Sequence, residues 1–303
     1  MTISKFYSLF PTEISCREYL RQMRETQGIT CKKCSGEKHF WLRRKEQWQC
    51  SKCNFRTTLL SGTLFESSKL KLRIWFQALY LVCNTKKGIS SCELQRQLGL
   101  KRNEPAWYMM QKIRKAMAQI NETQQLSGEI EMDDAFFATI EDPKKQSGRL
   151  IIDSQKNQGQ RSSKQKVLVM IESMTSDNGK VRNKCGKIRI LKTNSIGTDT
   201  LWSIDKQEIK NTTYIVRNKC RNFRVLDPHK YEPNVSEANK LNNISPWVHT
   251  AIGNSKRIIN GIYHHISSKF AQLYYDEFCF KFNFRFHQTK WNTVFLHALK
   301  ISW

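Results

Sequence analysis

Two closely spaced pairs of cysteines constrain the fold of this chain more than any other feature of its sequence. Cys31, Cys34, Cys50 and Cys53 form the pattern C-x2-C-x15-C-x2-C. Each pair can close a tight turn, and four thiolates suit a tetrahedral Zn²⁺ ion. The segment between the pairs, EKHFWLRRKEQWQC, alternates well enough for a β-hairpin, so the spacing predicts a structural zinc ribbon. The alternative interpretation is four unrelated cysteines in a small core.

The charge of the chain points to a polyanionic partner. Its 303 residues carry a formal net charge of +25, and double-stranded DNA is the usual partner of so basic a surface. An anionic membrane would compete, but the sequence has neither a lipidation signal nor an apolar run of about 18 residues. It also lacks the apolar stretch of a signal peptide. We therefore expect no membrane association and a cytoplasmic location, where ten cysteines favour metal ligation over disulfides.

The spacing of apolar residues predicts a multidomain α+β chain. Residues 1–30 contain an N-terminal helix that Thr12 can cap, 31–66 hold the ribbon, and 67–125 have helical spacing. Residues 126–303 form a last domain. It begins with short β-rich runs and returns to helical spacing from Pro246 onwards. The β-rich runs lie at 129–137, 166–173, 186–192 and 212–216.

Segment 87–117 has the pattern of two helices separated by a turn at Gly99. Apolar residues recur at three- and four-residue spacing in both halves, and basic residues lie on or beside them. This pattern predicts a helix-turn-helix that binds DNA. An ordinary helical hairpin with a solvated basic face is the alternative. The candidate DNA-binding residues of this segment are Arg96, Lys101, Arg102, Lys112 and Arg114.

The stretch EIEMDDAFF combines a strand pattern with a cluster of three carboxylates, Glu131, Asp133 and Asp134, which follow Glu129. Glu131 and Asp133 would share one face of the strand, while Ile130 and Met132 would be buried on the other. A carboxylate at the end of a central strand can hold a divalent metal ion, so Asp133 is a candidate magnesium ligand. A solvated acidic turn is the alternative.

Taken in order, these segments resemble the zinc-ribbon insertion-sequence transposases, a family related to the Merlin elements. The strings that carry the resemblance are SGTLFESSKLKLRIWFQALYLV, KKGISSCELQRQLGLKRNEPAWYMMQKIRKAM, LSGEIEMDDAFFATI and WVHTAIGNSKRIINGIYHHISSKFAQLYYDEF. They extend from about residue 6 to residue 287. Several are long, so a chance match does not explain them.

The resemblance implies a DNA transposase with a ribonuclease-H-like domain built on a mixed sheet. Enzymes of this kind use two Mg²⁺ ions to activate water or a 3′-hydroxyl for attack on a phosphodiester. By the match, Asp133 is the first metal ligand, Asn218 takes the second position and Asn254 the third. Some branches of the family carry Asn at the third position. Lys256 and Arg257 follow Asn254 and could bind phosphate.

The second position departs from the family, which has Asp-Gly where this chain has Asn218 and Lys219. An amide offers a neutral oxygen in place of a carboxylate, and the lysine adds a positive charge beside it. Because Asn254 is neutral too, Asp133 is the only acid among the three expected ligands. Glu131 or Asp134 could assist, but neither replaces a ligand on another strand. We therefore expect Mg²⁺ binding to be weak or lost.

The sequence thus predicts an insertion-sequence transposase with impaired catalysis. Its DNA partner would be the terminal inverted repeats of the element, bound by a homo-oligomer close to the bacterial nucleoid. One alternative is an active transposase in which the amide ligands suffice. Another is a non-enzymatic DNA-binding regulator derived from a transposase.

We predict that the purified chain binds one Zn²⁺ through its four paired cysteines. Substituting Cys50→Ser removes one of four thiolates and should release the metal, because a structural zinc site needs its full tetrahedral set. Elemental analysis of both proteins checks this. Cys92→Ser is the matched control, since that cysteine lies outside the pairs and its loss should leave the zinc content unchanged. A wild-type protein without zinc would contradict the prediction.

Overall fold

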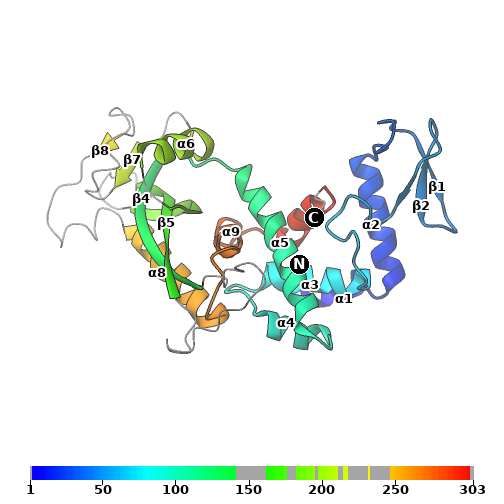
Figure 1. Ribbon diagram of the computed structural model, residues 1–303, viewed down its shortest axis with the longest axis horizontal. Coiled ribbons are helices and arrows are strands. Elements are labelled where there is room, and N and C mark those ends of the chain that lie inside the picture. Colours follow the sequence, from blue (N-terminus) through cyan, green and yellow to red (C-terminus); the bar gives the residue numbers. More distant parts are fainter. Residues whose placement is uncertain are drawn as a thin grey trace, which may run out of the picture. The chain divides into compact units, whose positions relative to one another are not determined.

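The chain divides into two compact units in the computed structural model. One unit comprises Met1–Met117 together with Phe286–Trp303, and the other comprises Ala118–Arg285. The structure describes residues 2–140, 162–175, 182–194, 197–210, 214–217, 231–232 and 246–300. Each unit is described here by itself, and Figure 1 labels most of their elements.

The first unit is mostly helical and carries one small sheet. Its strands pair antiparallel in the order β1-β2-β3, so the predicted hairpin is confirmed and gains a third strand. The strands are β1 (His39–Leu42), β2 (Gln47–Cys50) and β3 (Arg56–Thr58). The helices are α1 (Ile3–Leu9), α2 (Glu13–Gln27), α3 (Leu72–Asn84), α4 (Ser91–Leu98), α10 (Lys290–Ala298) and α5 (Asn103–Glu122), the last of which continues into the second unit.

Helix α2 begins where the sequence predicts. The Thr12 side chain accepts a hydrogen bond from the backbone N–H of Ser15, and the Ser15 hydroxyl accepts one from the backbone N–H of Thr12. This reciprocal arrangement satisfies N–H groups that have no partner within the helix. Cys16 and Leu20, one turn apart, are fully buried. The cap and the apolar stripe together determine where the helix starts and which side it buries.

Helix α2 packs against one face of the ribbon sheet. Trp41 and Trp48 are cross-strand neighbours on that face, with ring centroids 4.7 Å apart. The guanidinium of Arg21 lies 5.1 Å from the Trp41 ring centre, and that of Arg24 lies 4.9 Å from the Trp48 ring centre. The indole N–H of Trp48 donates to Glu25 Oε1 at 3.1 Å. Helix and ribbon are therefore one module, although the sequence predicts a domain boundary between them at residue 30.

The C-terminal helix α10 belongs to the first unit. The Trp291 ring stacks on the Phe295 ring at 5.0 Å, and it lies 5.3 Å from the Phe10 ring and 5.6 Å from the Phe76 ring. The Trp291 indole also donates to the backbone carbonyl of Phe76. The sequence predicts one domain over residues 126–303, whereas residues 286–303 belong to the first unit. Helical spacing shows that a segment has an apolar face, but not which core receives it.

The second unit is built on a five-stranded mixed sheet with the order β6-β5-β4-β7-β8. Strands β4, β5 and β6 pair antiparallel, whereas β7 and β8 run parallel to β4. The β-rich runs expected from the sequence all contain strands, and β4 continues past the acids, which therefore lie within the strand rather than at its end. The strands are β4 (Glu129–Ile140), β5 (Ser162–Thr175), β6 (Arg182–Lys192), β7 (Tyr214–Arg217) and β8 (Tyr231–Glu232).

Helices pack against both faces of this sheet. Alternate residues of β4, such as Ala135 and Phe137, join a core formed with α8 (Pro246–Ile258) and α9 (Ala271–Asn283). Ile130 and Met132 point to the opposite face of β4. They join a second core, to which α6 (Thr198–Glu208) contributes Leu201. A short π-helical segment, Ile259–Tyr263, follows α8. Because β4 is buried on both faces, it is the central strand from which the site is built.

We predict that Trp291→Ala lowers the free energy of unfolding by about 3–5 kcal/mol, because it removes a large buried ring from the core of the first unit. Urea denaturation followed by circular dichroism measures the change. Phe286→Ala is the control, since that ring is 84% exposed and its loss should cost less than about 0.5 kcal/mol. Equal effects of the two substitutions would show that α10 contributes nothing to this core.

Candidate metal centre and acidic site

The two cysteine pairs form nearly identical turns. In the first, the Ser35 N–H donates to the Cys31 carbonyl at 2.9 Å, and the Cys31 N–H donates to the Gly36 carbonyl at 2.9 Å. The second repeats this pattern between Cys50 and residues 54 and 55, at 3.0 and 2.9 Å. Ser35 and Asn54 both adopt positive φ, at 53° and 58°. Each turn therefore presents its two sulfur atoms to the same side.

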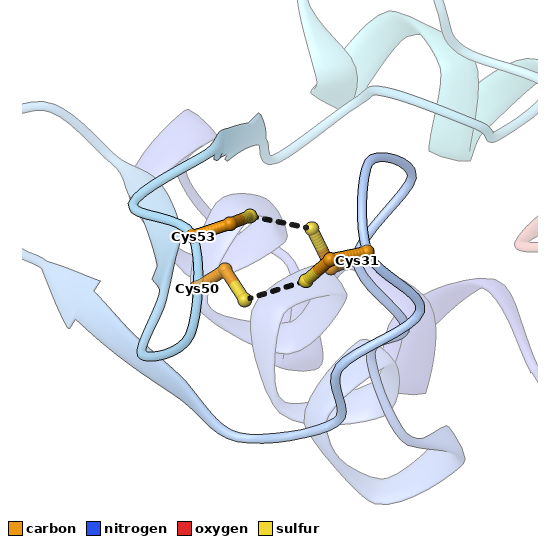
Figure 2. Close-up of side chains that lie close together, drawn as sticks. Cys31, Cys50 and Cys53 are labelled. Atoms are coloured by element: carbon orange, nitrogen blue, oxygen red, sulfur yellow. Dashed lines mark hydrogen bonds between the residues drawn. The ribbon is translucent and has the colours of Figure 1, made fainter.

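The four sulfur atoms lie close together, and Figure 2 shows the side chains of Cys31, Cys50 and Cys53 directed toward this cluster. Cys31 Sγ lies 3.5 Å from Cys53 Sγ, Cys34 Sγ lies 3.5 Å from Cys50 Sγ, and all four atoms lie within 4.8 Å of one another. A tetrahedral Zn²⁺ with Zn–S bonds of about 2.3 Å places its sulfur atoms about 3.8 Å apart. The spacing of these thiols therefore fits zinc. Among the described residues, no other group of three or more His, Cys, Asp or Glu side chains has such geometry.

The environment of the thiols favours a thiolate at one cysteine of each pair before any metal arrives. Burial opposes ionisation of Cys31, but backbone hydrogen bonds from residues 33 and 34 and the neighbouring thiols outweigh it and lower the pKa of Cys31 to about 6. Backbone hydrogen bonds from Cys53 and Lys52 lower the pKa of Cys50. At Cys34 the backbone N–H of Gly36 favours ionisation, but the neighbouring sulfur atoms outweigh it and raise the pKa to about 12. Gly36 approaches closely, and a Cβ there would lie 3.3 Å from the Cys50 sulfur. The turns are thus already shaped for a cation.

Glu131, the first acid of the cluster on β4, has a structural role. Glu131 is fully buried, and its Oε2 accepts hydrogen bonds from the backbone N–H groups of Trp247 and Val248, both at 2.9 Å. These residues open helix α8, so the carboxylate caps the helix and lies at the positive end of its dipole. Glu131 therefore anchors α8 to the central strand.

The second acid, Asp133, faces a histidine of the same helix. Asp133 is 9% exposed, and its Oδ2 lies 3.6 Å from Nδ1 of His249. The sequence analysis did not select His249. His249 is the third residue of the string WVHT, which opens the last block of the resemblance. Its ionisable side chain at that position is the feature of the sequence that could have selected it.

Asn254 and Lys256 make other contacts. The Oδ1 of Asn254 accepts a hydrogen bond from the guanidinium of Arg257 at 3.0 Å. Because a helix turns about 100° per residue, Asn254 lies about 140° around α8 from His249, the residue that contacts Asp133. The ammonium of Lys256 lies 5.8 Å from the Phe137 ring centre, on the His249 side of the helix.

The remaining members of the expected site are less fully described. Asn218 lies outside the described residues. The residue before it, Arg217, pairs with Met132 in the parallel ladder between β7 and β4. Asp134 points away from Asp133 along the strand and forms an ion pair with Lys166 at 3.2 Å. Among the residues that the structure describes, Asp133 belongs to no group of three or more His, Cys, Asp or Glu side chains that could hold a metal ion.

The helices predicted to bind DNA are present, with a left-handed Gly99 between α4 and α5. Lys101 and Arg102 are exposed, as is Arg96, which forms a salt bridge with Glu93. Two predicted contacts differ. The Lys112 ammonium donates to the backbone carbonyl of Leu64, and the Arg114 side chain is only 1% exposed. The sequence predicts both as DNA contacts on or beside the second helix, but α5 is buried around most of its circumference.

We predict that Glu131→Ala lowers the free energy of unfolding by about 2–4 kcal/mol, because two buried N–H groups lose a charged acceptor. Glu131→Gln keeps an oxygen at this position and should cost less than half as much. Glu122→Ala, at an exposed position, is the control for loss of an acid. Urea denaturation of the three variants measures the difference. Equal stability of Glu131→Ala and the control would rule out the capping role.

None of the helices in the described part of the chain is long and apolar enough to cross a membrane. A comparison with curated proteins finds no match. Two family models do match. Residues 11–56 match the transposase zinc-ribbon domain, which spans helix α2 and the ribbon, and residues 125–283 match the ISXO2-like transposase domain. The second match covers more than half of the chain and contains the sheet, Asp133 and α8. This chain therefore belongs to the family of insertion-sequence transposases that carry an ISXO2-like transposase domain.

Proposed function

We propose that this chain binds the ends of an insertion sequence as a transposase does, but cleaves DNA weakly or not at all. The observation that carries the proposal is the surroundings of Asp133, the one acid among the three family ligand positions. A histidine, rather than a second carboxylate, lies against it. Two-metal cleavage needs several anionic ligands to hold four positive charges close together.

The other two acids of the cluster, Glu131 and Asp134, do not make up the deficit. Glu131 is committed to the first turn of α8, and Asp134 is paired with Lys166. Asn254, the third family position, gives its side-chain oxygen to Arg257. Each of these contacts would have to be exchanged for a metal contact, and each exchange costs the energy of the interaction that is lost.

We infer that the second unit has a ribonuclease-H-like fold. The strand order supports this inference, since three antiparallel strands continue into two strands that run parallel to β4. In such a sheet the end of β7 lies beside Asp133, because Arg217 pairs with Met132. Asn218, the next residue along the chain, is our proposed occupant of the second ligand position.

DNA binding would involve the basic first unit and its two-helix segment. Lys101 and Arg102 lie in the turn between α4 and α5 and are exposed, so we propose that they contact the terminal inverted repeats. Arg257 is exposed on α8 and could contact a phosphate of the cleavage site. Recognition of two element ends would require a homo-oligomer, which we include in the proposal.

A second candidate function follows from the same surroundings of Asp133. A chain that binds element ends without cutting them would compete with active copies of the transposase and so repress transposition. This regulator and an impaired transposase differ in residual cleavage, which the following experiment measures.

We predict no detectable Mg²⁺-dependent cleavage of element-end DNA by the unmodified chain, with DNA binding intact. Loss of about 4 kcal/mol of transition-state stabilisation slows a reaction roughly a thousandfold. The measurements are nicking of labelled end DNA and calorimetric titration with Mg²⁺. Asn218→Asp combined with Lys219→Gly should tighten Mg²⁺ binding, because it adds a negative charge and removes a positive one.

The control is the same double substitution together with Asp133→Ala, which should abolish the gain in Mg²⁺ binding. The opposite result is informative as well. If the unmodified chain nicks its ends, and Asp133→Ala abolishes the activity while Asn218→Ala does not, the site is intact and Asn218 is not its second ligand.

A further inference from the structure

The ribbon sheet has an outer face that α2 does not cover. Trp41 and Trp48 occupy the inner face, against α2. Strand alternation directs their neighbours to the other side. In the register of the sheet, Phe40 on β1 lies opposite Gln49 on β2, which lies opposite Arg56 on β3. One row across the outer face therefore carries an aromatic ring, an amide and a guanidinium.

The ring of this row is unusually exposed for its size. Phe40 is 65% exposed, although it stands on a regular strand whose backbone is paired along its length. The polar members of the row are held in place, since Arg56 Nε donates to Gln49 Oε1 at 3.3 Å and Gln49 Nε2 donates to Asn54 Oδ1 at 3.0 Å. The polar side chains of the row are therefore positioned by hydrogen bonds, and the Phe40 ring is its one apolar member.

The ribbon that carries this ring is cationic. Between Cys31 and Thr58 it has two acids, Glu37 and Glu46, and the second is paired with Arg17 of α2. Its exposed cations outnumber them, and they lie in both cysteine turns, next to β1, in the hairpin turn and on β3. They are Lys32, Lys33, Lys38, Arg43, Arg44, Lys45, Lys52 and Arg56. The other large apolar side chain that the ribbon exposes is Phe55, at 37%, and it lies outside this row. An exposed ring on a cationic module suits a ligand that is both planar and polyanionic.

We propose that the outer face of the ribbon binds unpaired nucleotides of DNA, with a base stacked on Phe40 and the phosphates along the surrounding lysines and arginines. Single-stranded nucleic acids are commonly bound by exposed aromatic rings on open sheet faces within a basic surface. A duplex keeps its bases stacked on one another, so a duplex would engage the cations but not the ring. A protein partner would need a broader apolar patch than one ring.

This inference rests on the proposed function, because it takes DNA as the polyanionic ligand. It adds that the ribbon binds the unpaired nucleotides of that DNA. Element ends expose unpaired nucleotides when they are nicked or frayed. A ribbon that holds such nucleotides would recognise an opened end in preference to an intact duplex. The face involved contains none of the residues that the sequence analysis selected for DNA binding.

The test measures binding of the full zinc-loaded chain to a labelled oligothymidine of about 15 nucleotides by fluorescence anisotropy. Phe40→Ala should weaken binding between about 5- and 150-fold, the range expected for the loss of one stacked base. Phe40→Trp should bind at least as tightly as the wild type, whereas Phe40→Leu should resemble Phe40→Ala. Binding to a blunt duplex should change less than twofold in all three variants.

Phe286→Ala removes another highly exposed ring of the same unit and serves as the matched control, with no change expected. Zinc content and urea denaturation confirm that each variant is folded. Unchanged oligothymidine binding in Phe40→Ala would overturn the inference, as would wild-type binding in Phe40→Leu or an equal loss on the duplex. Failure to bind element-end duplex, with Phe40-dependent binding of oligothymidine, would refute the proposed function and leave this inference standing.

Discussion

The buried carboxylate of Glu131 organises the second unit. It lies on the central strand β4 and accepts two backbone hydrogen bonds from the first turn of α8. This contact determines where α8 starts against the sheet, and thereby which of its residues face the strand. His249 meets Asp133, and Lys256 lies over Phe137 further along. A cluster of three acids thus contains one helix cap, one surface ion pair and one candidate metal ligand.

The first unit depends on a different constraint, the burial of aromatic rings from both ends of the chain. Phe10, near the N-terminus, and Trp291, near the C-terminus, meet Phe76 of α3 in one core. The backbone carbonyl of Ala298 also accepts a hydrogen bond from Leu64. The chain consequently leaves the first unit within α5 and returns to it after Arg285. The second unit is therefore inserted into the first and not attached to its end.

The two sites of the protein differ in how complete they are. The zinc site has four donors of one kind at the distances that one ion requires, held by two turns with matching hydrogen bonds. The acidic site offers one carboxylate at the family ligand positions and places an imidazole against it. The family assignment explains why both sites exist. This physical difference is the basis of our proposal that the protein binds DNA while its cleavage chemistry is weakened.

Local features of the sequence were enough to predict the zinc ribbon, the Thr12 cap, the strands and the acids of β4, because cysteine spacing, capping residues and two-residue alternation act over a few positions. The family resemblance made Asp133 the first of three expected ligands, added Asn254 as the third, and located the departure at Asn218. Only the tertiary structure decided that α10 joins the first core, that Arg114 is buried, that Glu131 caps α8 and that His249 meets Asp133. These outcomes depend on which surfaces meet across more than a hundred residues of chain. Periodicity specifies that a face is apolar or charged, but packing selects its partner.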